Sequence, residues 1–184
     1  MLSGPQLFER LAPSVLRVEC KRPDGVAQGS AVVVAPTLAL TNCHVLERAT
    51  SIVVAQGTQQ WPAVLEQSDA AKDRCILKVT NANLTPINGV RPFADLKVGE
   101  SVYTLGTPSG LELMMADGLL SGRREEGGVR YVQTSAPISP GSSGGGLFDA
   151  HGNLVGITTL ALIGSKNLNQ SLNFAIAAES FWTP

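Results

Sequence analysis

A glycine-rich loop in the C-terminal half of the chain presents a serine in a setting that suits a nucleophile. The loop reads Ser139-Pro140-Gly141-Ser142-Ser143-Gly144-Gly145-Gly146, and its glycines would let another chain approach the backbone closely. The loop alone is ambiguous, because residues 141–145 also fit the G-x-S-x-G turn of α/β-hydrolases and because a Gly/Ser stretch can be a plain flexible turn. A serine hydroxyl also needs a base to accept its proton.

Histidine is the usual base near neutral pH, and the chain has two histidines. His151 lies in a turn of an expected hairpin, where we expect a solvated side chain without a function. His44 follows an apolar strand, in Leu40-Thr41-Asn42-Cys43-His44-Val45, which would hold it at the edge of a core. Asp73 stands 29 residues later, at the head of an apolar segment. A carboxylate there needs a hydrogen-bond partner, which an imidazole NH could supply.

The order of these residues separates two kinds of hydrolase. An α/β-hydrolase needs an acid and then a histidine after its serine. After Ser143 the chain offers only Asp149 followed by His151, which are too close together to reach around the nucleophile. The order His44, Asp73, Ser143 is instead that of chymotrypsin. The sequence therefore predicts these three residues as a catalytic triad.

Short apolar runs rich in Val, Ile, Leu and Thr predict strands, and turn sequences separate them. The predicted strands are residues 14–19, 31–35, 51–55, 63–66, 75–80, 101–105, 113–115, 118–121, 129–134, 154–162 and 171–176. Short helices are predicted at residues 6–11, directly after His44, and at 177–182. This pattern favours an all-β sandwich or barrel, and composition alone would favour an ordinary β-sandwich binding module. Residues 84–96 resemble a linker, so we expect one β unit in residues 1–88 and a second in residues 89–184.

Composition narrows the function classes. The chain has 184 residues, of which 43% are hydrophobic and 16% charged, enough apolar material for one or two cores. Its 14 basic and 15 acidic residues include no basic run, which argues against a nucleic-acid or anionic-membrane binder. No apolar stretch approaches the roughly 20 residues of a membrane-spanning helix. The three cysteines lack the paired spacing of a zinc site. We therefore expect protein or peptide partners, with no metal and no cofactor.

Five motifs, in order, resemble those of the HtrA/Deg branch of trypsin-like serine proteases. They differ from the usual family pattern at Ser142 and Cys43, where the family usually has Asn. The resemblance implies two packed six-stranded antiparallel β-barrels with the active site in the cleft between them, and the chain ends without the family's typical PDZ domain. The motifs are Thr41-Asn42-Cys43-His44-Val45, Asp73-Arg74-Cys75-Ile76-Leu77-Lys78-Val79, Leu105-Gly106-Thr107-Pro108-Ser109-Gly110, Gly118-Leu119-Leu120-Ser121-Gly122, and the segment from Gln133 to Gly145.

The resemblance also implies roles for single residues. The backbone NH groups of Gly141 and Ser143 would form an oxyanion hole. Thr159 would lie beside Asp73, and the backbone of residues 159–161 would pair with substrate. The alternative is that Thr159 is an ordinary strand residue without such a role. An apolar specificity pocket would select small or medium aliphatic side chains. The alternative is that the leucines of this pocket merely fill the core of the second barrel. The floor of the pocket would be Pro137 with Ile138 beside it, and its walls would come from Leu160 or Leu162 and from Leu172, whereas Ala161 would contribute its backbone to the pairing with substrate.

Several expectations remain open at this point. Cys43 and Cys75 neighbour two triad residues that must meet, so we expect a disulfide between them, with Cys20 free; the alternative is two buried thiols.

A chaperone-like or peptide-binding module with little turnover would share this fold, and the resemblance leaves room for a homo-oligomer. Residues 1–13 lack the apolar core of a signal peptide. The protein is therefore either periplasmic or secreted, with its export signal outside this chain, or cytoplasmic.

Overall fold

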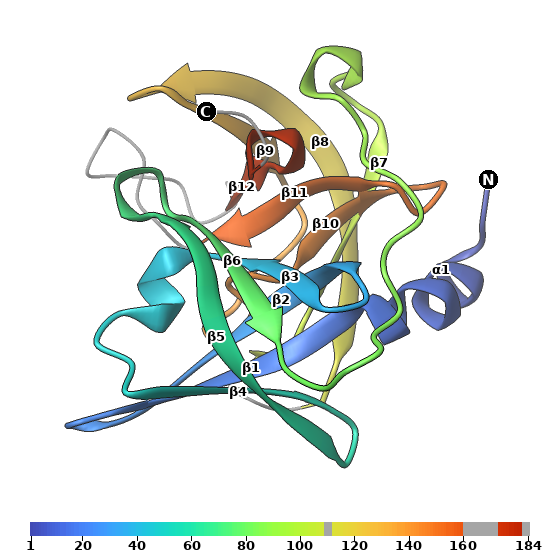
Figure 1. Cartoon of the computed structure of the whole chain (residues 1–184). Coiled ribbons are helices and arrows are strands. Elements are labelled where there is room, and N and C mark those ends of the chain that lie inside the picture. Colours follow the sequence, from blue (N-terminus) through green and yellow to red (C-terminus); the bar gives the residue numbers. More distant parts are fainter. Residues whose placement is uncertain (109–111, 160–172, 182–184) are drawn as a thin grey trace.

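Two closed antiparallel barrels form the body of the protein (Figure 1). The computed structural model describes residues 1–108, 112–159 and 173–181. The first barrel has the strand order β1-β2-β3-β6-β5-β4 and the second the order β10-β11-β12-β9-β8-β7. This architecture confirms the predicted all-β class of two packed six-stranded barrels. The division at residues 88 and 89 stays a prediction.

The strands of the first barrel are β1 (Val15–Arg22), β2 (Gly25–Ala35), β3 (Leu38–Thr41), β4 (Ser51–Gln56), β5 (Gln59–Asp69) and β6 (Arg74–Val79). Those of the second are β7 (Ser101–Gly106), β8 (Met114–Glu126), β9 (Val129–Thr134), β10 (Gly146–Asp149), β11 (Leu154–Thr159) and β12 (Asn173–Ala177). The described helices are α1 (Gly4–Leu11) and the short 3₁₀ turns η1 (Ala12–Ser14), η2 (Cys43–Leu46), η3 (Ala70–Lys72), η4 (Phe93–Asp95) and η6 (Ala178–Phe181).

Several strands differ from the sequence prediction: β2 and β5 extend well beyond the predicted residues 31–35 and 63–66, and β8 and β10 differ as well. The predicted strands at 113–115 and 118–121 form one strand, β8, because Ala116 and Asp117 keep their pairing with Thr104 and Tyr103 of β7. The strand β10 was not predicted, because its four residues follow directly on the glycine-rich loop. All four are nevertheless buried. The glycine-rich loop of residues 139–146 therefore leads straight into the core of the second barrel.

The apolar residues that the structure describes form three buried clusters, which are separated by the alternation of side chains along the strands. In β2, Ala31 and Val33 face the interior of the first barrel, whereas Val32 faces the second. The cluster between the barrels joins side chains from both, so it fixes one barrel against the other. Its members include Val32, Leu40 and Ile76 of the first barrel, and Leu105, Phe148, Ile157 and Ile176 of the second.

The N-terminal helix α1 packs against the cluster between the barrels. Its Leu7 and Leu11 are buried there, and Ser3 and Gln6 form a reciprocal capping box that satisfies its first backbone NH groups. The Leu2 NH donates to the carbonyl of Ala150, in the turn between β10 and β11. Residues at the very start of the chain thus contact the second barrel. No helix among the described residues is long and apolar enough to cross a membrane.

Candidate active site

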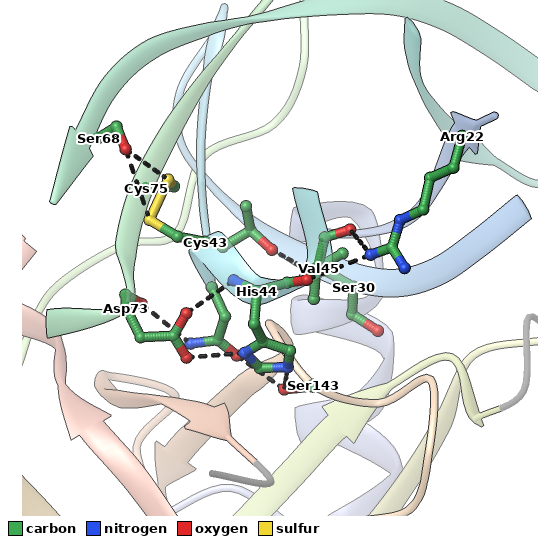
Figure 2. Close-up of polar contacts among 11 residues, drawn as sticks. Arg22, Ser30, Cys43, His44, Val45, Ser68, Asp73, Cys75 and Ser143 are labelled. Carbon is green, nitrogen blue, oxygen red and sulfur yellow. Dashed lines mark hydrogen bonds and ion pairs between the residues drawn. A yellow bond between two sulfur atoms is a disulfide. The ribbon is translucent and has the colours of Figure 1, made fainter. Parts of the chain in front are cut away.

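His44 is carried by the turn η2, which begins two residues after β3 ends. Thr41 pairs with Cys75 of β6 in the barrel, so the end of β3 lies next to the start of β6. The Arg22 guanidinium of β1 donates to the carbonyls of His44 and Val45 at 3.3 and 3.4 Å (Figure 2). The His44 carbonyl also accepts from the Glu47 NH at 3.4 Å. The contacts from Arg22 therefore add to the turn's own hydrogen bond and fix the backbone that carries His44.

Asp73 occupies the junction between η3 and β6 in a left-handed conformation, with φ of 57°. Aspartate tolerates this region better than most residues. The neighbouring Asp69 accepts from the Lys72 NH at 3.3 Å and pairs with Arg74 at 2.9 Å. The hydrogen bond from Arg74 lowers the pKa of the Asp69 carboxyl, and Arg74 also donates to the Ser180 carbonyl at 2.6 Å. The residues before and after Asp73 in the chain are thus fixed by these contacts, and they hold the backbone of Asp73 in place.

The three predicted triad residues meet at the boundary between the barrels (Figure 2). Both carboxylate oxygens of Asp73 are used: Oδ1 accepts from the His44 backbone NH at 2.8 Å, and Oδ2 lies 2.8 Å from His44 Nδ1. Ser143 Oγ lies 3.1 Å from His44 Nε2. The side chains of His44 and Asp73 are 38% and 18% exposed, so the imidazole is open to a substrate while the acid is shielded.

The glycine-rich loop turns sharply before Ser143. The Ser142 NH donates to the Ser139 carbonyl at 2.9 Å, and Gly141 between them has φ of 87°. A Pro-Gly pair with positive φ at its glycine is typical of a type II turn. Among the described residues, neither the Gly141 NH nor the Ser143 NH donates to a protein acceptor. Within the part of the chain that the structure describes, no protein acceptor therefore competes for these two NH groups.

Ser30 of β2 ties the first barrel to this loop, and sequence reasoning missed it. Its NH donates to the Ser143 carbonyl at 2.8 Å, and its fully buried hydroxyl donates to the Gly141 carbonyl at 3.1 Å. The NH of Thr107 donates to the same hydroxyl at 3.0 Å. A Cβ at Gly144 would overlap the Ser30 carbonyl, so the loop requires glycine there. Asn42 was missed as well: its side chain contacts Ser143 Oγ at 2.8 Å.

A comparison with protein families matches the trypsin-like peptidase domain to residues 29–157, which include His44, Asp73 and Ser143. The chain belongs to the trypsin-like peptidase family. The resemblance to the HtrA/Deg branch is also confirmed, because the serine endoprotease DegS of Haemophilus influenzae is 37% identical over 147 residues, covering 74% of this chain and 42% of DegS. Serine protease HTRA1A of Danio rerio is 30% identical over 190 residues, covering 94% of this chain and 38% of HTRA1A.

Solved structures agree with this assignment. The HtrA-type protease AlgW with a tripeptide superposes with a TM-score of 0.86 at 31% identity, covering 98% of this chain and 62% of AlgW. The active form of the Rv3671c protease from M. tuberculosis, at 22% identity, has a TM-score of 0.84 over 94% of this chain and 79% of that one, which supports the fold. The chain spans about two fifths of the length of the two curated relatives.

The residues predicted for a specificity pocket are described in part. Pro137 is exposed and Ile138 half-buried, and both line a cavity of about 150 Å³ beneath the loop. The other described lining residues carry no charge: Thr104, Leu105, Gly106, Pro108, Met114, Met115, Ala116, Ser139, Ser142 and Thr158. Thr159 is buried at the end of β11. The structure does not describe the other predicted pocket residues, which are Leu160, Ala161, Leu162 and Leu172.

Within the described ranges, no cluster of three or more His, Cys, Asp or Glu residues could hold a metal ion.

The structure joins Cys43 and Cys75 in a disulfide beside the triad (Figure 2). Their Cα atoms are 5.1 Å apart, and Ser68 Oγ lies within 3.9 Å of both sulfurs. Cys20 is free and buried in the first barrel, where burial raises the pKa of its thiol to about 11. The bond connects the segment of His44 to that of Asp73 and would hold the two together.

We predict that this disulfide forms in the protein as isolated under oxidising conditions. Alkylation of the denatured, unreduced protein should then modify one cysteine, Cys20, and alkylation after reduction should modify three. The bond closes a loop of 32 residues, so its reduction should lower the free energy of unfolding by about 3 to 4 kcal/mol on the loop-entropy model. Intact-mass measurement decides the first point, and three modified cysteines without reduction would exclude the bond.

Proposed function

We propose that this peptidase-family chain is a serine endopeptidase that cleaves proteins through an acyl-enzyme on Ser143. The observation that carries the proposal is the continuous line of contacts from Asp73 Oδ2 through His44 to Ser143 Oγ, at 2.8 and 3.1 Å. Such a line lets imidazole accept the serine proton while the carboxylate holds the tautomer and stabilises the imidazolium.

The reaction would proceed in two acyl transfers. Ser143 Oγ attacks the peptide carbonyl carbon, and its proton passes to His44 Nε2. His44 then gives this proton to the leaving amine, and the C–N bond breaks. A water molecule repeats the sequence on the ester, with His44 again as base, which releases the carboxylic acid and restores the Ser143 hydroxyl.

The Gly141 and Ser143 NH groups would stabilise the negative oxygen that develops in each step. Their support is the positive φ of Gly141 and the lack of a protein acceptor for either NH in the described residues. Removal of one such donor in other proteases costs on the order of 3 kcal/mol of transition-state stabilisation. The same conformation of the loop is held by Ser30 through the Gly141 and Ser143 carbonyls.

The substrates would be unfolded segments of proteins, bound as an added strand along residues 159–161, of which the structure describes Thr159 alone. We also propose a periplasmic or secreted setting. Its support is the disulfide, which persists in oxidising compartments. A second support is the 37% identity over 125 residues to the probable periplasmic serine endoprotease DegP-like of Hahella chejuensis.

We predict that cleavage occurs after small or medium aliphatic residues. Pro137 and Ile138 offer apolar contact, and none of the described residues around their cavity carries a charge that could pair with Arg or Lys. Discrimination between neighbouring aliphatic residues should be modest, because one methylene is worth about 1 to 3 kcal/mol.

Mass-spectrometric mapping of the new N-termini produced from an unfolded protein measures this preference and turnover together. A Ser143→Ala preparation, treated in the same way, removes cuts due to contaminating proteases. A clear preference for Arg or Lys before the cut would contradict the pocket assignment.

A further inference from the structure

The side chain of Asn42 lies directly against the nucleophile. Asn42 follows β3, comes two residues before His44, and is fully buried. Its Oδ1 accepts a hydrogen bond from Ser143 Oγ at 2.8 Å, and its Nδ2 donates to the Asp73 carbonyl at 3.4 Å. A single buried amide therefore touches the nucleophile and the segment of the acid at the same time.

The second contact fixes the orientation of this amide. The Asp73 carbonyl can only accept hydrogen bonds, so the amide nitrogen must face it. The oxygen then faces Ser143, and because an amide oxygen accepts and does not donate, the Ser143 hydroxyl must be the donor in this contact.

The Ser143 hydroxyl has one proton and, among the described residues, two acceptors within reach. Asn42 Oδ1 lies at 2.8 Å and His44 Nε2 at 3.1 Å. Nucleophilic attack requires the proton to lie on the line to His44. Once Ser143 is acylated, its Oγ has no proton to donate to Asn42. The contact with Asn42 therefore exists in the free protein and is lost along the reaction, and an interaction of that kind slows the step that breaks it.

We propose that Asn42 is a positioning residue that holds the Ser143 proton away from His44 while no substrate is bound. Asn42 thereby restrains the nucleophile in the free protein, and the hydroxyl must turn from Asn42 Oδ1 to His44 Nε2 before it attacks. The inference rests on the proposed function, since it concerns the readiness of the same Ser143.

The ¹⁵N resonance of His44 Nε2 tests the restraint without any turnover. Accepting a hydrogen bond moves the resonance of such a ring nitrogen upfield. At about pH 9, well above the ordinary pKa of histidine, the unmodified protein and Ser143→Ala should give the same Nε2 shift, because the hydroxyl donates to Asn42. Asn42→Ala should move Nε2 upfield, because the freed hydroxyl then donates to it. An upfield Nε2 in the unmodified protein relative to Ser143→Ala would overturn the proposal.

The rate of reaction with a small fluorophosphonate provides the second readout. Loss of one net hydrogen bond corresponds to roughly a two- to tenfold change, so Asn42→Ala should react about two to ten times faster than the unmodified protein. Asn42→Leu keeps the side-chain volume without a polar group and should react faster in the same way, which separates the hydrogen bond from packing. Slower reaction of both variants, with Nε2 unmoved, would show that Asn42 is only a packing residue.

Ser68→Ala is the matched control, since Ser68 lies beside the Cys43–Cys75 disulfide and has no contact with Ser143 among the described residues. We expect it to leave both the Nε2 resonance and the probe rate unchanged. If no form of the protein reacts with the probe, the proposed function fails, whereas the Nε2 shifts still decide the placement of the Ser143 proton.

Discussion

Replacement of Ser143 by alanine should lower the rate of peptide hydrolysis by roughly 10⁴- to 10⁶-fold, as removal of the nucleophile does in unrelated serine proteases. The change deletes one oxygen, whose partners are His44 Nε2 and Asn42 Oδ1 at 3.1 and 2.8 Å. The backbone contacts of the loop do not involve this oxygen, so the thermal unfolding transition should move by only a few degrees. Hydrolysis of an unfolded protein and a thermal melt measure the two effects.

Ser121→Ala is the control for this experiment. Ser121 lies on β8, its side chain is exposed, and its hydroxyl contacts only the nearby Leu119 carbonyl among the described residues. We expect unchanged hydrolysis in this variant. Turnover by a clean Ser143→Ala preparation at more than about one percent of the normal rate would contradict the assignment of the nucleophile.

Replacement of Asp73 by asparagine should lower kcat by about 10⁴-fold, the magnitude seen for the corresponding change in chymotrypsin-like proteases. Oδ1 of Asp73 accepts from the His44 backbone NH at 2.8 Å, so an asparagine must keep its oxygen at that position. Its NH₂ group then replaces Oδ2 and faces His44 Nδ1. The imidazole is forced to carry its proton on Nε2, where it cannot accept the proton of Ser143.

A comparison with Asp69→Asn separates this effect from a general loss of structure. Asp69 lies four residues before Asp73 in the chain, caps η3 and pairs with Arg74. Among the described residues, it does not contact His44. We expect Asp69→Asn to lower the melting temperature while kcat stays within about tenfold of normal. A kcat near normal in Asp73→Asn would contradict the assignment of the acid.

The positions of single strands could be predicted from the sequence where the apolar pattern of the strand is uninterrupted. β1, β4, β7 and β9 fall within a few residues of their predicted positions. The strand β10 could not be predicted in this way. Its four residues show no alternation, because all of them are buried, and it is defined by pairing with β7 and β11.

The same distinction holds for the site. That His44, Asp73 and Ser143 lie together could be predicted, because chain order and residue type leave few alternatives. Ser30 and Asn42 carry no comparable signal, since serine and asparagine are common polar residues. Their contacts with the glycine-rich loop cross sequence separations of 111 and 101 residues, and depend on how one barrel packs against the other.

Labelling with a fluorophosphonate, followed by mass spectrometry of the digested protein, tests the central claim most directly. The probe reacts with a serine whose proton can be accepted by a neighbouring base, as the 3.1 Å contact between Ser143 Oγ and His44 Nε2 would allow. We predict a single adduct on Ser143 that is absent from Ser143→Ala and greatly reduced in Asp73→Asn. A folded, disulfide-bonded protein that forms no adduct under any activating condition, or forms one on another residue, would contradict the account and favour a peptide-binding module.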